Sequence, residues 1–288
     1  MAKLCCCYDV LNQLCLWTSL DSWAKAEHHT AIEHMDQSPE KVLLIYDRHF
    51  PSFECFYAHY RANKDFLMRI QSNFRMVKHF VESGLSSKIF AYKITYNQIN
   101  PLRAKGYQVN KDSVLPVRLI RVELDSGEIE VLVTSLMDDK LYPSACFKEL
   151  YNLRWGVETF FERVKHKMAL ESFAGYKPIC IRQEVFAHIF VANLQSLMVS
   201  AAKEDYDKKS TKTKYRYQPN YQFALGLIKQ KILDLFRKNS LGEALEFIHQ
   251  YLRKTLEPVR KGRTFPRITS TTAKHVKHKT FFNFKPVL

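Results

Sequence analysis

The sequence predicts an α/β protein, a mixed sheet with flanking helices that is interrupted by an antiparallel β segment and followed by a helical, basic C-terminal region. Three observations support this fold class. Residues 41–46 (KVLLIY) form a short, nearly continuous apolar run, which is typical of a strand covered on both faces. Residues 71–135 alternate Val, Ile and Tyr with polar residues, as antiparallel strands do. From Pro143 onward, apolar residues recur at helical spacing.

Local signals predict the elements around the first apolar strand. Residues 3–20 are expected to form a β-hairpin, and a helix over 23–37 would begin at Ser22 as its N-cap. Pro51 suits the first turn of the next helix, because its φ angle is already helical. Residues 65–70 have the composition of another strand.

The later part of the chain is predicted to be mostly helical. Residues 125–128 (DSGE) form a turn between two alternating runs. A polar, charged stretch over 203–220 is expected to be a linker or an exposed loop. Helical periodicity predicts four helical segments, over 143–170, 179–202, 221–238 and 241–254.

The chain has a large positive charge. It has 44 Lys and Arg against 29 Asp and Glu, a net charge of +15, and a pI near 9.4. This excess indicates a polyanionic partner, either nucleic acid or an anionic membrane. The most apolar stretch, 185–202, contains His188, Asn193 and Gln195, which favours a buried helix over a membrane span and hence nucleic acid as the partner. The odd number of cysteines, seven, and the absence of a secretory signal predict reduced thiols in a cytosolic protein.

Basic residues gather toward the C-terminus. From residue 253 to the end there are ten Lys and Arg and one acidic residue. We expect the densest group to contact DNA phosphates, and a solubilising tail is the alternative. That group consists of Arg260, Lys261, Arg263 and Arg267. Elsewhere, the adjacent His28 and His29 lack the spacing of a zinc site.

One predicted helix carries a mixed set of charged and polar side chains. Tyr151, Arg154, Glu158 and Lys165 fall within an arc of roughly 60° on an ideal helix. The carboxylate could hold a metal ion, and the cations could hold phosphates on either side of it, as phosphodiester chemistry requires. The alternative is a solvated face with an Arg154–Glu158 salt bridge. Glu162 shares this face, so spacing alone does not single out Glu158.

Asp47 is the second candidate carboxylate. It follows the strand over 41–46, and open α/β sheets place their sites just beyond the carboxyl ends of strands. The alternative is a turn residue or a helix cap before Pro51. Together, Asp47 and Glu158 would make half of a two-metal carboxylate site, which suits Mg²⁺ because that ion combines few carboxylates with substrate phosphates.

Two runs resemble a known family. The segment YNLRWGVETFFERVK carries Tyr-x2-Arg-x3-Glu-x6-Lys, which resembles the YREK signature of transposases of bacterial insertion sequences in the group numbered four. The segment LLIYDRHFPS resembles the family's strand that ends in Asp-Arg-Gly-(Tyr/Phe). The resemblance extends over nearly the whole chain and is weakest in 71–135 and after residue 203. Further similar runs are YDVLNQL, FLMRI and the stretch from Leu170 to Asn193.

The resemblance implies a ribonuclease-H-like fold with a β insertion and an Asp-Asp-Glu triad that holds two divalent metals, Mg²⁺ or Mn²⁺. Asp47 would be the second carboxylate and Glu158 the third, both catalytic and metal-binding. Tyr151, Arg154 and Lys165 would contact DNA phosphates, as would Arg48 beside Asp47. The expected division is a first part of the core, a β insertion, a second part of the core, and a linker with helices and a basic arm, over 1–70, 71–138, 139–202 and 203–288.

Two departures from the family pattern matter. His49 stands where the family has Gly, so this loop cannot as easily adopt a positive φ. The family's first Asp lies on a strand well upstream of the hairpin, and neither Asp9 nor Asp21 matches that position. We therefore expect an amino-terminally truncated transposase that lacks the first strand and one metal ligand. Loss of one carboxylate predicts that the isolated chain is a weak or inactive catalyst.

The functional expectation is a DDE transposase that cuts transposon ends and joins the 3′-hydroxyl to target DNA, incomplete in this chain. Its partners would be double-stranded DNA and a second copy of the chain, in the cytoplasm of a bacterium at the nucleoid and without a membrane. One alternative is a non-catalytic DNA-binding remnant, or an inhibitor of an intact transposase. Another is a Mg²⁺-dependent nuclease without strand transfer.

Overall fold

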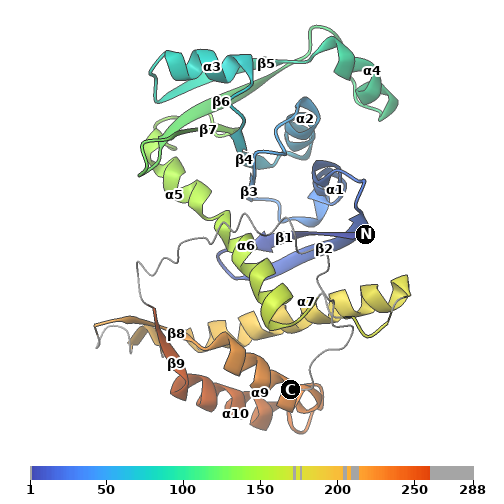
Figure 1. The fold of residues 1–288 in the computed structure, drawn as a ribbon, viewed down its shortest axis with the longest axis vertical. Helices are drawn as coiled ribbons and strands as arrows, with labels where there is room; N and C mark the ends of the chain where they lie inside the picture. The colour runs from blue at the N-terminus through green and yellow to red at the C-terminus, as the bar shows by residue number, and fades with distance from the viewer. Residues whose placement is uncertain (1, 171–172, 176, 204–205, 209–213, 260–288) are drawn as a thin grey trace, which may run out of the picture. The chain divides into compact units, whose positions relative to one another are not determined.

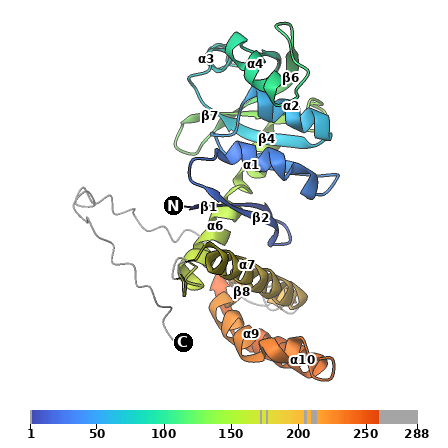
Figure 2. The ribbon, with the colours of Figure 1, turned by 90° about the vertical axis from the view of Figure 1, so that its right-hand side faces the viewer.

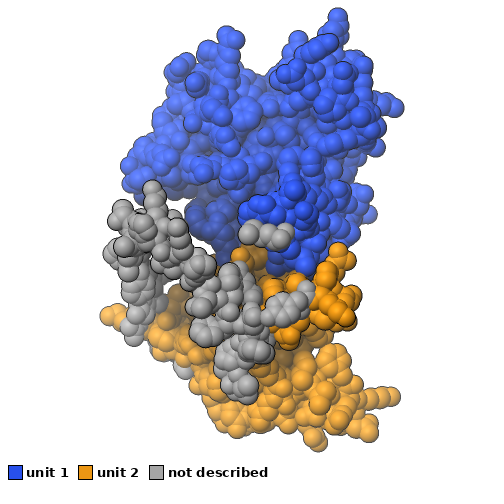
Figure 3. Space-filling model, turned by 45° about the vertical axis from the view of Figure 1, so that its right-hand side comes forward, with its two compact units in different colours: residues 1–10, 16–158 blue, residues 11–15, 159–288 orange. Residues whose placement is uncertain are grey.

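The computed structural model describes residues 2–170, 173–175, 177–203, 206–208 and 214–259. The chain divides into two compact units (Figure 3). The first combines Met1–Val10 with Leu16–Glu158, and the second combines Leu11–Cys15 with Thr159–Leu288. The boundary between the units thus falls directly after Glu158.

The chain begins with the predicted hairpin. Strands β1 (Ala2–Asp9) and β2 (Leu14–Ser22) form a two-stranded sheet, followed by helix α1 (Glu27–Glu33) and the short 3₁₀ helix η1 (Met35–Gln37) (Figure 1). The prediction of one helix over 23–37 with Ser22 as its cap is wrong. Ser22 belongs to β2, and α1 starts after Ala26, which has no side-chain capping bond.

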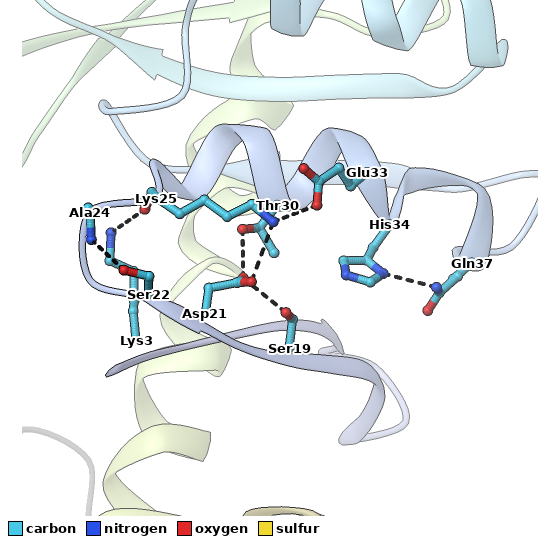
Figure 4. Close-up of polar contacts among 10 residues, drawn as sticks. All are labelled: Lys3, Ser19, Asp21, Ser22, Ala24, Lys25, Thr30, Glu33, His34 and Gln37. Atoms are coloured by element: carbon cyan, nitrogen blue, oxygen red, sulfur yellow. Dashed lines mark hydrogen bonds and ion pairs between the residues drawn. The ribbon is translucent and has the colours of Figure 1, made fainter. Parts of the chain in front are cut away.

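A carboxylate joins the hairpin to α1. Asp21 accepts hydrogen bonds from Thr30 (2.8 Å), Ser19 (2.9 Å) and the ammonium of Lys25 (3.4 Å) (Figure 4). Burial alone would raise the pKa of Asp21, and these three bonds outweigh it and lower that pKa. The network gives Asp21 a structural role within the first unit.

A five-stranded mixed sheet is the centre of the first unit. Its strand order is β3-β4-β7-β6-β5, in which β3 and β4 are parallel and the other neighbours are antiparallel. The strands expected as a β insertion therefore continue the core sheet through β7. The strand bounds are β3 Leu43–Tyr46, β4 Asp65–Ile70, β5 Ser87–Lys93, β6 Val114–Glu123 and β7 Ile129–Thr134.

Alternation along the strands sends apolar side chains to both faces of this sheet. Phe66 and Met68 of β4 join a core with helices α2 (Phe53–Ala62), α3 (Arg75–Glu82) and α4 (Tyr96–Ala104). Leu67, on the opposite face, packs in a second core that includes Phe147 and Tyr151 of helix α5 (Phe147–Asn152). Two core layers thus enclose β4, and helix α5 covers the second face.

The connections after β3 and β4 differ in part from the sequence prediction. The strand over 65–70 and the turn at 125–128 are confirmed, the latter with Gly127 at φ +82°. Helix α2 begins at Phe53, not at Pro51, because Ser52 caps it by accepting from the Cys55 amide at 3.1 Å. Helices α3 and α4 lie inside the segment predicted as purely β.

The second unit is mainly helical, as predicted. Helix α7 (Pro178–Ala201) packs with α9 (Tyr221–Leu235) and α10 (Leu241–Lys254) around one apolar core, and α9 and α10 lie side by side in Figures 1 and 2. Strands β8 (Arg216–Pro219) and β9 (Leu256–Val259) form a small antiparallel sheet. The predicted basic group at Arg260, Lys261, Arg263 and Arg267 lies outside the described residues.

Among the described residues, α7 is the one helix long and apolar enough to span a membrane. Its polar side chains have partners within the second unit. Asn193 forms two 2.8 Å hydrogen bonds with the backbone of Cys15. His188 contacts the carbonyl oxygens of Glu184 at 2.6 Å and Met168 at 3.0 Å. These bonds are typical of a helix built into a folded unit.

Candidate active site

Asp47 lies directly after β3, at the carboxyl end of that strand. Its Oδ1 accepts a 2.7 Å hydrogen bond from the backbone amide of His49, and its Oδ2 lies 3.4 Å from Nδ1 of the same residue. Asp47 therefore caps its own turn, as the alternative prediction had it. Its side chain is 40% exposed, and a carboxylate has about four lone-pair sites, so acceptor capacity remains for a ligand. His49 keeps a negative φ, so this loop adopts no left-handed backbone at that position.

The sheet register places two further charged residues beside Asp47. Tyr46 pairs with Met68 in the parallel register of β3 and β4. The next residues along the chain, Asp47 and Arg69, therefore lie beside each other. Arg69 pairs with Leu132 on β7, and Glu130 lies two residues away on the same face. Arg69 Nη1 and Glu130 Oε1 form a 2.7 Å ion pair. Sequence reasoning missed this pair, because only the pairing of β4 with β7 brings the two residues together.

Tyr151 covers this face of the sheet from α5. Its ring is buried in the core with Leu67 and Leu132. Burial raises the pKa of Tyr151 to about 12, the charges of Glu130 and Asp47 add to the rise, and those of Arg154 and Arg69 oppose it. The phenol therefore stays protonated at neutral pH and can donate a hydrogen bond.

The helix that was predicted to carry the whole signature is broken. Helix α5 ends at Asn152, α6 (Trp155–Glu162) follows after a turn, and the π-helical turn η3 (Arg163–Lys167) follows α6. The single arc expected for the four signature residues is therefore wrong. Backbone hydrogen bonds between residues three positions apart tighten the connection. The Arg154 amide, for example, donates to the Tyr151 carbonyl at 3.0 Å.

A glycine lies at the start of α6 where the hairpin approaches it. A Cβ on Gly156 would lie 2.9 Å from Cγ1 of Val10 and 3.3 Å from its Cβ. A side chain at position 156 would push Val10 away, so Gly156 allows the hairpin to pack closely against α6. This packing fixes the start of the helix that carries Glu158.

Arg154 and Glu158 form a close ion pair within the first unit. Arg154 Nη1 donates to Glu158 Oε1 at 2.5 Å. The guanidinium lies over the rings of Trp155, at 4.6 Å, and Tyr151, at 5.8 Å. The Arg154 side chain is 15% exposed, and its buried Nε has no hydrogen-bond partner in the described structure. A buried donor without a partner is a suitable contact for an anionic oxygen.

The remaining predicted phosphate contacts lie at the surface. Arg48 follows Asp47 and is exposed, while its backbone carbonyl accepts from Gln71 at 3.2 Å. Lys165 is exposed in η3 and belongs to the second unit. Within the first unit, Arg154 contacts both Tyr151 and Glu158, and the charge of Asp47 acts on the pKa of Tyr151.

The donor chemistry of Asp47 and Glu158 suits Mg²⁺ or Mn²⁺. Both are carboxylates with partly exposed side chains, 40% for Asp47 and 47% for Glu158. Mg²⁺ binds one or two carboxylates together with substrate phosphates. Within the described residues, neither carboxylate belongs to a cluster of three potential ligands. By donor type, each carboxylate suits such a cation.

Comparison with known proteins identifies the class. The family model described as "Transposase DDE domain" matches residues 1–194 of the chain. A search of curated proteins found no match. The chain belongs to the DDE transposase domain family. This family consists of metal-dependent enzymes that act on DNA.

Proposed function

We propose that this protein is a DDE transposase of the insertion-sequence group numbered four, with the YREK signature Tyr151, Arg154, Glu158 and Lys165. It would hydrolyse a phosphodiester bond at a transposon end and join the freed 3′-hydroxyl to target DNA. The fold would correspond to a ribonuclease-H-like core that is extended by a β insertion. The substrate would be double-stranded DNA, held by two copies of the chain in the bacterial cytoplasm.

One observation carries this proposal. Tyr151, on α5, is close enough to Asp47 and Arg154 for both charges to affect its pKa. The next helix holds Glu158 in contact with Arg154. Three side chains of the resembling signature and the carboxylate after β3 are thereby linked in one unit, although more than 100 residues separate Asp47 from Glu158 in the sequence.

Each residue has a distinct proposed role. Asp47 and Glu158 would hold the divalent metal, which supplies Lewis-acid activation of the phosphodiester and of the attacking oxygen. Arg154 would direct its unpartnered Nε–H to a phosphate oxygen while the rings of Tyr151 and Trp155 hold its plane in place. Arg48 and Lys165 would bind flanking phosphates by charge, and Tyr151 would donate a hydrogen bond.

The experiment is a nicking assay on supercoiled plasmid with Mg²⁺ and with Mn²⁺. We expect slow nicking by the full chain that is lost in Glu158→Gln and retained in Glu162→Gln, a matched carboxylate of the same helix. Equal nicking by the Glu158→Gln variant would overturn the proposal. Supplying a free 3′-hydroxyl oligonucleotide then separates transposase from nuclease, because only a transposase joins it to the plasmid.

A second candidate function is a non-catalytic DNA-binding protein that occupies transposon ends or inhibits an intact transposase. The observation in its favour is that, among the described residues, neither Asp47 nor Glu158 belongs to a cluster of three potential metal ligands. In that case the full chain would bind DNA with salt-dependent affinity and show no nicking with either metal. The same plasmid assay, paired with a binding titration, distinguishes the two functions.

A further inference from the structure

Two helices of the first unit bring together three side chains that can bind a metal. His28 and His29 lie in α1, and Glu54 lies in the first turn of α2. One ligand atom from each residue lies within 4.8 Å of the other two. Nε2 of His29 is 3.6 Å from Oε2 of Glu54, and all three residues are partly buried. The fold creates this cluster, since Glu54 lies 25 positions beyond His29.

A cation already occupies part of this cluster. Nζ of Lys105, at the C-cap of α4, lies 2.8 Å from both carboxylate oxygens of Glu54 and 3.0 Å from Nε2 of His29. Burial raises the pKa of Tyr107, and the nearby Glu54 carboxylate adds to that rise. The Lys105 side chain is 41% exposed, so its ammonium can move out into solvent without leaving an apolar pocket.

We propose that His28, His29 and Glu54 form a binding site for a divalent transition metal of the Zn²⁺ class, with Lys105 as its internal competitor. Two imidazoles and a carboxylate, with a fourth position open to solvent, are a known zinc ligand set. Ligand atoms around a tetrahedral Zn²⁺ are separated by roughly 3.3–3.4 Å, given bonds of about 2.0–2.1 Å. The 3.6 Å between Nε2 of His29 and Oε2 of Glu54 is close to this value. The other ligand atoms lie within 4.8 Å of one another, and side-chain rotation can bring them to the required separation.

The site lies between two helices of the first unit. Metal binding would release Lys105 and connect α1 directly to the start of α2, the helix that follows the Asp47 turn. This inference is independent of the proposed transposase activity.

The experiment is a Co²⁺ titration of the full chain by absorption spectroscopy, in excess Mg²⁺ so that oxygen-only sites stay filled. The absence of a thiolate-to-cobalt charge-transfer band distinguishes this site from the seven cysteines. We expect d–d bands from one equivalent that are lost in Glu54→Gln and in His29→Ala, and a melting temperature raised by Co²⁺. His79→Ala, on the exposed face of α3, is the matched control and should leave the bands unchanged.

Lys105→Met tests the competitor directly and does not depend on the folding of the ligand variants. Removing a unit charge a few ångströms from the site should tighten Co²⁺ binding about tenfold. Unchanged affinity in Lys105→Met, or full retention of the bands in Glu54→Gln, would overturn the assignment. Zn²⁺ added after Co²⁺ should displace the Co²⁺ and remove the d–d bands, because a site of the Zn²⁺ class binds Zn²⁺ more tightly than Co²⁺.

Discussion

Arg154 donates a 2.5 Å hydrogen bond to Glu158, so a cation and a carboxylate with different proposed roles are paired to each other. Glu158 is 47% exposed, and pairs of this kind typically contribute less than about 1 kcal/mol. A metal ion and a DNA phosphate can therefore replace this pair at small cost. The pair thus does not prevent the proposed roles, a metal ligand for Glu158 and a phosphate contact for Arg154.

The first prediction separates the charge of Arg154 from its shape. Arg154→Lys keeps the charge and loses the planar group that stacks on Trp155, so DNA affinity should fall about tenfold with little change in salt dependence. Arg154→Met should also lower the slope of log K against log salt by about 1. Fluorescence anisotropy over a salt series measures both quantities. An effect no larger than that of Arg75→Met, an exposed arginine on α3, would contradict the assigned contact.

The second prediction concerns the contact between the hairpin and α6. Gly156→Ala should lower the free energy of unfolding by about 1–2 kcal/mol, because the new methyl group would lie 2.9 Å from Val10. Gly226→Ala is the matched control in α9, where no atom lies within 4 Å of the added Cβ. That variant should be neutral, or more stable by up to about 1 kcal/mol. Urea denaturation of both variants checks the difference, and equal stabilities would refute the close approach.

The third prediction concerns Asp21, whose pKa is lowered in the folded state by the bonds that outweigh its burial. Its stabilisation is therefore present above the ordinary pKa of 3.8 and is lost as the pH falls through the lower folded value. Asp21→Asn should reduce the free energy of unfolding by about 1–3 kcal/mol at pH 7, and by less at pH 3. Denaturation at the two pH values measures this, with Asp36→Asn as an exposed control. A loss that is equal at both pH values would argue against the charged network.

The fourth prediction concerns a fully buried histidine in α2. Burial lowers the pKa of His59 to about 4, although its contact with the Lys64 carbonyl opposes the shift. The unfolded chain therefore binds about one more proton than the folded chain between the ordinary pKa of 6.5 and pH 4. The contribution of neutral His59 to the free energy of unfolding is therefore fully present above pH 6.5 and declines as the pH falls towards 4. His59→Phe should remove that part of the acid sensitivity, and His79→Phe should not. Parallel pH profiles for parent and His59→Phe would contradict this account.

Local sequence patterns predicted elements whose signals are local. The strand over 65–70, the turn at Gly127 and the two helices near the C-terminus follow from alternation, turn chemistry and helical period. Helix α1 could not be located as well, because Ser22 is a good cap by type but is held in β2 by strand pairing. Helices α3 and α4 were missed because their short spans lie between strands with strong alternation.

For the candidate site, too, the sequence predicted what local patterns carry and missed what depends on contacts between distant residues. Asp47 was proposed from its position after an apolar run, and Glu158 from the resemblance of its segment to the YREK signature. The Arg69–Glu130 pair depends on the register of β4 with β7, which sequence spacing does not contain. The break between Asn152 and Trp155 lies next to Gly156, where Val10 packs closely, and that contact joins residues far apart in the chain.

The most direct test of the central claim is a Mn²⁺-binding titration of the full chain with duplex DNA, in which electron paramagnetic resonance measures free Mn²⁺. Four proteins are compared, namely the parent, Asp47→Asn, Glu158→Gln and the control Glu162→Gln. We predict at least tenfold weaker binding in Asp47→Asn and in Glu158→Gln, and unchanged binding in the control. Four identical binding curves would contradict the assignment of Asp47 and Glu158 as the metal ligands of this transposase domain.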